Sequence, residues 1–182
     1  MEGIIYFTKT EKEERGSRLH HMVGEKLLET GLMREYGKDL KYEPRGTGEH
    51  GKPFFTLSPD IHYNISHSGV YVMCAFAGIP VGLDVQKHEK KVNYELLLRR
   101  TVPQGMIREI LDADNIEKAF YTQWVLREAF IKWTGEGLSR DMRTIPMDQG
   151  DYQLLDLEEG YSAAIWSGHP LIIRMEYVDI TI

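Results

Sequence analysis

Residues 124–135 read WVLREAFIKWTG, a run with helical spacing and apolar side chains on most of its circumference. Glu128 and Lys132 interrupt this run one helical turn apart. Charged groups among Trp, Val, Leu, Phe and Ile side chains cost free energy unless something pairs with them. The stretch therefore predicts a largely buried helix that ends at Gly135 and whose charged residues need partners.

The composition and charge of the chain exclude several classes of protein. Its 182 residues, 42% of them hydrophobic and 27% charged, are typical of a soluble globular protein. A net charge of -6 excludes a nucleic-acid-binding protein that works through bulk electrostatics. No run approaches the ~20 apolar residues that span a bilayer, and the acidic start, MEGIIYF, differs from a secretory signal. We therefore expect a cytoplasmic protein that binds neither nucleic acid nor membrane.

The first third of the chain carries the signals of a strand, a helix and a loop. Residues 3–7 predict a strand, and residues 10–13, TEKE, have the form of a helix-capping box. Gly31 is the expected end of the helix, and residues 42–53, rich in Gly and Pro, predict an exposed loop. The helix is predicted from its apolar spacing: Leu19, Met22, Val23, Leu27 and Leu28.

Three short runs with the character of β-strands follow. They are IHYNIS (61–66), VYVMCAF (70–76) and VGLDV (81–85). The turns HSG and AGIP between them predict an antiparallel meander. Cys74 is the only cysteine of the chain and lies in the second run, so we expect a small buried hydrophobe and neither a disulfide nor a multi-cysteine metal site.

The second half begins with helical periodicity and ends with strand-like runs. Residues 93–101 and 104–113 predict two short helices, and Asp114 with Glu117 is the expected capping pair of the long helix. The runs YQLLDL, YSAAIW and LIIRMEYVDITI then predict strands.

Helices and strands thus occur in both halves of the chain. This distribution predicts an α+β fold. It further suggests two α+β lobes, residues 1–87 and 88–182, within a single unit.

Asp84 and Glu128 are the first candidates for chemistry. In GLDVQ (82–86), the two-residue period of a strand sends Asp84 and Gln86 to one face and the apolar residues to the other. Two carboxylates among apolar residues can share a divalent cation, and carboxylates, waters and phosphates are the ligands that Mg²⁺ prefers. Alternatively, Glu128 pairs with Lys132 and Asp84 caps a turn, and the spacing leaves both interpretations open.

The sequence NISHSG (64–69) combines two serines and a histidine at a tight hairpin. Backbone N–H groups, hydroxyls and one imidazole at a turn suit a phosphate. A nucleophilic Ser–His pair is a weaker interpretation, because neighbouring strand residues point to opposite faces. A hairpin with polar turn residues remains the simplest reading of this motif in isolation.

Four motifs in chain order resemble those of one enzyme family. GKP (51–53), NISHS, GLDVQ and WVLREAFIKWTGEGLS (124–139) are similar to the motifs of the 4′-phosphopantetheinyl transferases, specifically the larger single-chain type that activates peptide and polyketide synthetases. The resemblance implies two similar α+β lobes in a pseudo-twofold arrangement, with coenzyme A and Mg²⁺ between them. It also implies transfer of the phosphopantetheine arm of coenzyme A to a serine of an apo carrier protein, releasing adenosine 3′,5′-bisphosphate.

The resemblance also implies roles for the motif residues. Asp84 and Glu128 match the carboxylate ligands of Mg²⁺, and Glu128 is a candidate for orienting or deprotonating the carrier serine. Lys132 would reach a pyrophosphate oxygen and stabilise the leaving phosphate. The expected coenzyme A contacts are Ser66 and His67 for the nucleotide phosphates, and Lys52 with Pro53 for the edge of the adenine pocket.

Two positions depart from the family pattern. Gln86 stands where many relatives have a second acid, so its amide oxygen would ligate Mg²⁺ or hold one of its waters, with weaker metal affinity. Arg127 stands where relatives usually have lysine, and its guanidinium could fork onto a phosphate. For the 3′-phosphate, the loosely matched N-terminal region offers Arg15, Arg18 and His20, of which Arg18 is preferred.

The resemblance predicts a monomer that docks an acidic carrier protein. A net charge of -6 gives no long-range attraction, so local charge from Arg99, Arg100 and Arg108 could supply the docking face, or these are ordinary solvated helix residues. Two rival functions remain open. One is a non-catalytic relative that binds coenzyme A or a carrier protein, and the other is a metal-dependent hydrolase of the coenzyme A pyrophosphate.

Overall fold

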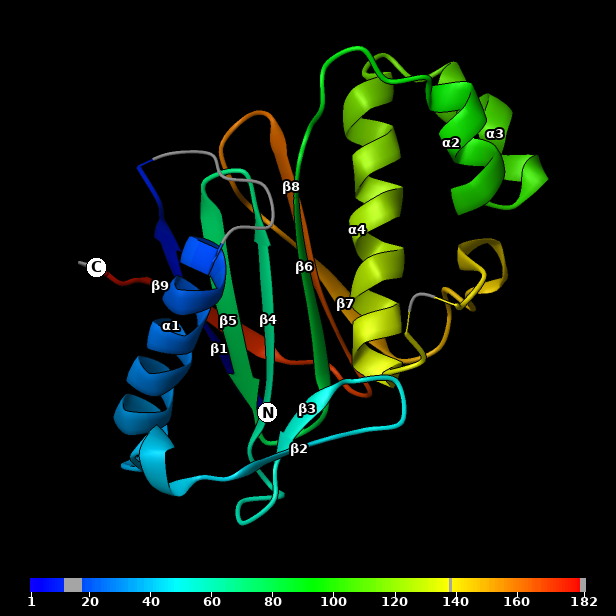
Figure 1. The fold of residues 1–182 in the computed structure, drawn as a ribbon. Coiled ribbons are helices and arrows are strands. Elements are labelled where there is room, and N and C mark those ends of the chain that lie inside the picture. Colours follow the sequence, from blue (N-terminus) through cyan, green and yellow to red (C-terminus); the bar gives the residue numbers. More distant parts are fainter. Residues whose placement is uncertain (12–17, 138, 181–182) are drawn as a thin grey trace.

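The computed structural model describes residues 1–11, 18–137 and 139–180, which form two main sheets flanked by helices (Figure 1). The four-stranded sheet has the order β4-β5-β1-β9, the three-stranded sheet has the order β6-β8-β7, and β2 and β3 form a separate hairpin. The strands are β1 (Glu2–Lys9), β2 (Arg45–Thr47), β3 (Pro53–Phe55), β4 (His62–Ser68), β5 (Tyr71–Ala77), β6 (Val81–Lys87), β7 (Asp151–Leu155), β8 (Tyr161–Ser167) and β9 (Ile172–Tyr177).

Helices and sheets together confirm the predicted α+β class. The described helices are α1 (Arg18–Tyr36), α2 (Tyr94–Thr101), α3 (Gln104–Leu111) and α4 (Ile116–Thr134), with 3₁₀ turns at η1 (Leu40–Tyr42) and η2 (Met142–Thr144). Within the described residues, no helix is both long enough and apolar enough to cross a membrane.

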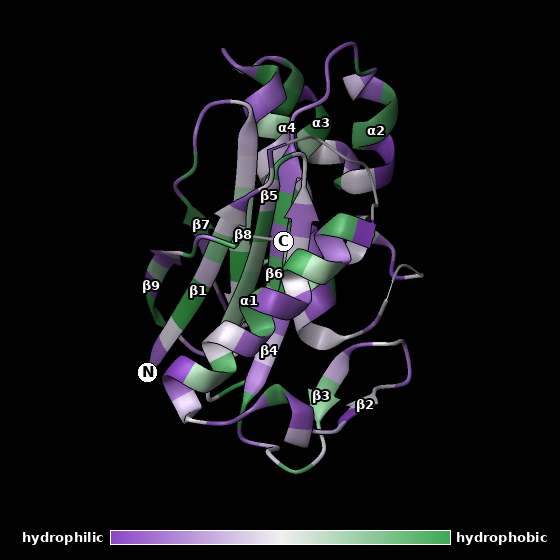
Figure 2. Ribbon diagram, turned by 60° about the vertical axis from the view of Figure 1, so that its left-hand side comes forward, coloured by the Kyte–Doolittle hydropathy of each residue, from purple (hydrophilic) through white to green (hydrophobic). Residues whose placement is uncertain are grey.

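The two sheets pack against each other, and each has a long helix on its outer side (Figure 1). α1 packs on the four-stranded sheet through an apolar cluster that includes Leu27 and Leu28. α4 packs on the three-stranded sheet around Trp166, and α2 and α3 pack against the first half of α4. Figure 2 shows the same layers from another side, with hydrophilic and hydrophobic residues alternating along α1. Each of the strand-like runs predicted from the sequence contains a strand, and Cys74 is buried as predicted.

The predicted antiparallel meander is wrong in its third strand. β4 and β5 pair antiparallel, but β6 leaves them and pairs antiparallel with β8. β9 crosses the other way and pairs parallel with β1. Turn residues alone did not reveal this exchange, because they fix where a strand ends and not which edge it joins. The division into lobes at residue 87 stays a prediction, and each sheet contains one strand from the other side of that position.

Gly31 does not end the first helix. α1 continues to Tyr36, and the turn that follows has Gly37 in the left-handed region at φ 63°. A Cβ at Gly31 would lie only 2.2 Å from the Phe76 ring, so this glycine allows the helix to lie close to β5. The predicted capping box at residues 10–13 lies partly outside the described residues.

Three further local predictions need correction. The stretch 42–53 is not simply an exposed loop, because it contains β2 and leads directly into β3. The cap of α4 is Asn115, whose side chain accepts a hydrogen bond from the Lys118 N–H, and not Asp114. The last strand-like run is also shorter than predicted, since β9 ends at Tyr177. The predicted end of the long helix is confirmed, with Gly135 at φ 73°.

Candidate active site

α4 lies directly against β6 because Gly82 has no side chain. A Cβ at this position would lie 2.0 Å from the Ala129 carbonyl oxygen and 2.2 Å from the Trp133 nitrogen. Alternate strand residues face the same side, so Asp84 also faces α4. The tight contact at Gly82 thus brings Asp84 to the part of α4 that carries Lys132.

β4 and β6 are edge strands of different sheets, and polar side chains join them. Backbone N–H groups of β6 donate to side-chain oxygens of β4. The pairs are Leu83 N to Asn64 Oδ1 at 2.8 Å, Val85 N to Ser66 Oγ at 3.1 Å, and Lys87 N to Ser68 Oγ at 3.0 Å. The constant offset between the partners means that the two strands run parallel. We call this contact the seam, and it satisfies N–H groups of an otherwise open edge.

Ser66 links the seam to the charged residues of the site. Its hydroxyl accepts hydrogen bonds from the Val85 N–H and the Lys132 ammonium group, the latter at 2.9 Å, and donates to Asp84 Oδ1 at 3.1 Å. The Lys132 ammonium group also donates to Asp84 Oδ1 at 2.7 Å. Among the described residues, the ion pair of Lys132 is thus with Asp84 and not with Glu128.

Both carboxylates of the site carry an electrostatic cost. Burial raises the pKa of Asp84, although the adjacent Lys132 ammonium and the Ser66 hydroxyl oppose this change. Burial also raises the pKa of Glu128, and the negative charge of Asp84 raises it further. Asp84 Oδ2 is buried and has no hydrogen-bond partner. A cation between the two carboxylates would relieve both the repulsion and the missing contact.

The oxygen donors available for a metal are few. Across residues 1–11, 18–137 and 139–180, no three or more His, Cys, Asp or Glu side chains are grouped so that they could hold a metal ion. Asp84 and Glu128 are therefore complemented by Gln86, which follows Asp84 on the same face of β6. Its amide nitrogen makes one long contact, 3.4 Å, to the Lys87 carbonyl oxygen. This donor set of carboxylate and amide oxygens suits a hard divalent cation that keeps several waters.

His88, two residues after Gln86, contacts the N-terminal end of α4. His88 Nδ1 lies 2.9 Å from Glu117 in the first turn of α4, and His88 Nε2 lies 2.9 Å from the hydroxyl of Ser162, the cross-strand neighbour of Gln86. The imidazole also stacks on Tyr121, with the ring centroids 4.4 Å apart. These contacts tie the chain that follows β6 to both α4 and β8.

Ser66 and His67 point to different sides of β4, as neighbouring strand residues must. Ser66 is buried in the seam, whereas His67 is exposed and its ring lies 4.9 Å from that of His20 on α1. Burial lowers the pKa of His67, and the nearby His20 and Lys132 lower it further. These basic groups from α1, β4 and α4 leave the surroundings of His67 suited to an anion.

Lys52 and Pro53 line a pocket of about 510 Å³ at the C-terminal end of α4. Aromatic side chains on its wall include Phe54, Tyr63 and Trp133. Burial lowers the pKa of Lys52 to about 8. A pocket with aromatic walls and a few polar groups suits a flat heterocycle.

Two of the predicted coenzyme A contacts lie away from the Asp84 network. Arg127 is fully buried on the opposite side of α4, where its guanidinium donates to Gln123 and contacts the sulfur of Met106. Burial lowers its pKa to about 10. Arg18 is exposed at the first residue of α1, two residues before His20, and Arg15 lies outside the described residues. The geometry at Arg127 indicates a packing contact with α3.

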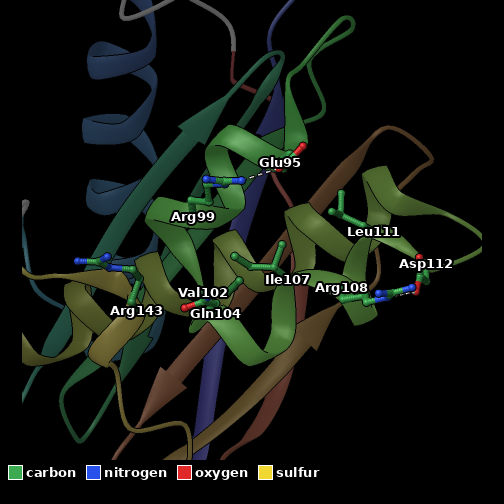
Figure 3. A pocket seen from close by; sticks show the side chains of 9 residues that line it. All are labelled: Glu95, Arg99, Val102, Gln104, Ile107, Arg108, Leu111, Asp112 and Arg143. Carbon is green, nitrogen blue, oxygen red and sulfur yellow. Dashed lines mark hydrogen bonds and ion pairs between the residues drawn. The ribbon is translucent and has the colours of Figure 1, made fainter.

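A larger pocket lies between α2, α3 and η2, on the far side of α2 from the sheets (Figure 3). It measures about 700 Å³, and Ile107 and Leu111 contribute to its floor. Two of the arginines considered for docking line it, but each is paired on its own helix, Arg99 with Glu95 and Arg108 with Asp112. The surface is therefore of mixed charge, and none of the Asp84, Ser66 or Lys132 side chains lines it.

Several residues of the site were missed by reasoning from sequence. Asn64 and Ser68 share the face of β4 with Ser66, and their period of two in NISHS is a signal that could have identified the seam. Gly82 and the pair of His88 with Ser162 give no such signal, because their partners are distant in sequence. Their roles depend on which elements pack together.

Comparison with known proteins identifies the family of the chain. Residues 80–177 match the family described as the 4′-phosphopantetheinyl transferase superfamily. The chain is similar to the 4′-phosphopantetheinyl transferase Sfp of Bacillus subtilis (strain 168), at 30% identity over 93% of this chain and 86% of that protein. It is also similar to a 4′-phosphopantetheinyl transferase of Bacillus subtilis, at 33% identity over 93% of this chain and 76% of that protein.

Proposed function

We propose a mechanism for this chain from the premise that it belongs to the 4′-phosphopantetheinyl transferase superfamily. It is an enzyme that transfers the 4′-phosphopantetheine moiety of coenzyme A to a serine of an apo carrier protein, releasing adenosine 3′,5′-bisphosphate. The observation that carries the mechanism is the Asp84–Lys132 pair beside Glu128, in which Asp84 Oδ2 is buried without a partner. Such a group is costly to the fold and therefore points to function.

Asp84, Glu128 and the Gln86 amide oxygen would hold Mg²⁺. Bound there, the ion would neutralise charge on the pyrophosphate while the phosphoanhydride bond breaks. Because Gln86 stands where a site with three acids would have another carboxylate, we expect weaker metal binding than in such a site. Magnesium dependence as tight as in such a three-carboxylate site would contradict this proposal.

Lys132 and Glu128 would act on the reacting groups. The Lys132 ammonium group, now on Asp84 and Ser66, would donate to a pyrophosphate oxygen and stabilise the leaving phosphate. Glu128 would orient or deprotonate the carrier serine. Ser66 would hold Lys132 and Asp84 in register rather than accept a phosphate directly.

The nucleotide would extend from His67 towards Lys52 and Pro53. His67 with His20 and Arg18 would meet phosphate groups, and the pocket at the end of α4 would take the adenine. Arg127 has no part in this arrangement, because its guanidinium is enclosed on the other side of α4. The acidic carrier would dock near α2 and α3, where Arg100 is exposed. We further propose a cytoplasmic monomer that does not bind nucleic acid.

Intact-mass analysis of an apo acyl carrier protein tests this function. The carrier is incubated with coenzyme A, Mg²⁺ and either the wild type or Glu128→Gln. We expect a phosphopantetheine-sized increment with the wild type and a rate about 10²–10⁴-fold lower with the variant. No increment across several carriers, with coenzyme A still bound, would instead indicate the non-catalytic relative. Adenosine bisphosphate released without any carrier would indicate the hydrolase.

A further inference from the structure

Lys52 connects the two elements that carry the Asp84–Lys132 pair. Its ammonium group donates to the Trp133 carbonyl oxygen at 2.8 Å and to the Val81 carbonyl oxygen at 3.0 Å. Trp133 lies in the last turn of α4, and Val81 is the first residue of β6. The β2–β3 hairpin lies beside the end of α4 and the start of β6 (Figure 1), and the Lys52 side chain from the loop before β3 contacts both.

Both carbonyl groups would otherwise lack a strand or helix partner. The last carbonyls of a helix have no partner within the helix. In an antiparallel strand the N–H and C=O of one residue point to the same side. Because the Leu83 N–H points to the seam, the Val81 carbonyl also points to that open edge of β6. Side chains of β4 thus hydrogen-bond to the open edge of β6 along the seam, and Lys52 does the same at the first residue of the strand.

The chain beyond α4 folds closely over this contact. Gly135 and Gly137 both have φ 73°, a region that favours glycine. A Cβ at Gly135 would lie 3.4 Å from the Lys52 side chain, and one at Gly137 would lie 3.0 Å from His50. The loop of the hairpin and the end of α4 are thus packed together, which leaves the Lys52 ammonium directed at backbone oxygens.

Burial of the Lys52 ammonium group costs free energy. Burial lowers its pKa to about 8, and its two hydrogen bonds go to neutral carbonyl groups. An amine retains two N–H donors even after it loses a proton, so both contacts survive near the pKa. A buried ammonium that serves backbone carbonyls is suited to fixing the distance between two elements.

We infer that Lys52 is a positioning residue, which holds the last turn of α4 against the start of β6 so that Lys132 meets Asp84. This inference rests on the proposed function, because that function gives the Asp84–Lys132 pair its role in the reaction. Lys132 directly precedes Trp133 on α4, and Asp84 follows Val81 by three residues on β6, so the Lys52 contact lies close to the pair on both elements. The Lys52 side chain then affects turnover more than coenzyme A affinity.

The steady-state kinetics of Lys52→Met separate this role from a contact with the nucleotide. We expect kcat to fall about 10-fold while KM for coenzyme A changes less than about 2-fold. Lys52→Arg should restore most of kcat, because a guanidinium group can donate to both carbonyls. Lys118→Met, which changes an exposed lysine in the first turn of α4, should leave both constants unchanged. A raised KM with unchanged kcat would overturn the inference.

Amide hydrogen exchange tests the same inference without turnover. Lys52→Met should increase exchange in the last turn of α4, at residues 131–134, and leave α1 unchanged. Unchanged exchange in that turn would overturn the positioning role, whatever the unfolding temperature of the variant. An inactive wild type with the expected exchange pattern would contradict the proposed function alone.

Discussion

The two long helices each cover one sheet, but only one of them places charged side chains in the contact. α1 faces its sheet with fully buried leucines, among them Leu27, Leu28 and Leu32. α4, of the same length of 19 residues, adds Glu128 and Lys132 to its apolar contacts. The apolar contact of α1 stabilises the fold, whereas burying the charged groups of α4 costs free energy, a cost that the proposed function would explain.

The position of the glycines differs in the same way. On the α1 side the glycines are on the helix, where Gly24 and Gly31 let it lie close to β4 and β5. On the α4 side the glycine is on the strand, where Gly82 admits the helix backbone. A glycine on the helix makes room for side chains, while a glycine on β6 fixes the distance from Asp84 to α4.

The largest effect on stability is expected from α1. Leu28→Ala should lower the free energy of unfolding by about 2–5 kcal/mol, because the side chain is fully buried and leaves a cavity. Urea unfolding measures this change, and Leu96→Ala on the exposed face of α2 is the control. The kcat of the folded variant should equal that of the wild type. A reduced kcat would show that the apolar contact of α1 supports the Asp84–Lys132 pair and would break the comparison.

Gly82→Ala should reduce both stability and turnover. The new Cβ would meet backbone atoms of α4, so we expect a loss of about 3 kcal/mol and a kcat at least about 10-fold lower. The matched variant is Gly24→Ala, whose Cβ would lie 3.1 Å from the Ile65 side chain and would meet no backbone atom closely, and it should cost less than about 1 kcal/mol. Equal effects on kcat in the two variants would contradict the role assigned to Gly82.

Ser66→Ala and Ser68→Ala sharpen the comparison within the seam. Each removes one side-chain acceptor from a β6 N–H, so each should lower the free energy of unfolding by about 1–2 kcal/mol. Ser66 alone of the two also contacts Asp84 and Lys132, so only Ser66→Ala should reduce kcat. Thermal unfolding and the carrier-modification rate measure the two effects. A comparable loss of kcat in Ser68→Ala would assign turnover to the seam as a whole.

Glu128→Gln should stabilise the metal-free protein at neutral pH and raise its unfolding temperature, because burial raises the pKa of the Glu128 carboxyl and disfavours its charged form. The folded-state pKa of Glu128 is raised, so its contribution is fully present below the unfolded-state pKa and is lost as pH rises through the folded-state value. The advantage of the variant should therefore grow from pH 4 to pH 8 in thermal unfolding. Added Mg²⁺ should raise the unfolding temperature of the wild type more than that of the variant, and the opposite result would contradict Glu128 as a ligand.

Most elements of the fold could be predicted from local patterns, while their pairing could not. The continuous apolar run VYVMCAF and the long apolar run before Gly135 correctly identified β5 and the end of α4. Gly31 was misread as a helix end because a glycine needed for packing and a glycine needed for a turn look the same in sequence. The exchange of β6 and β9 between sheets depends on contacts between distant segments, which no local window contains.

The sequence by itself determined the α+β class, the family and the identity of the charged residues, because motif residues and their spacing are local properties of the chain. Only the tertiary structure decided which of these residues meet. It paired Lys132 with Asp84 instead of Glu128, turned Arg127 away from the site and directed Lys52 to backbone carbonyls. The reason is that a buried charged group pairs with a polar group that packing places next to it, and packing depends on the whole fold.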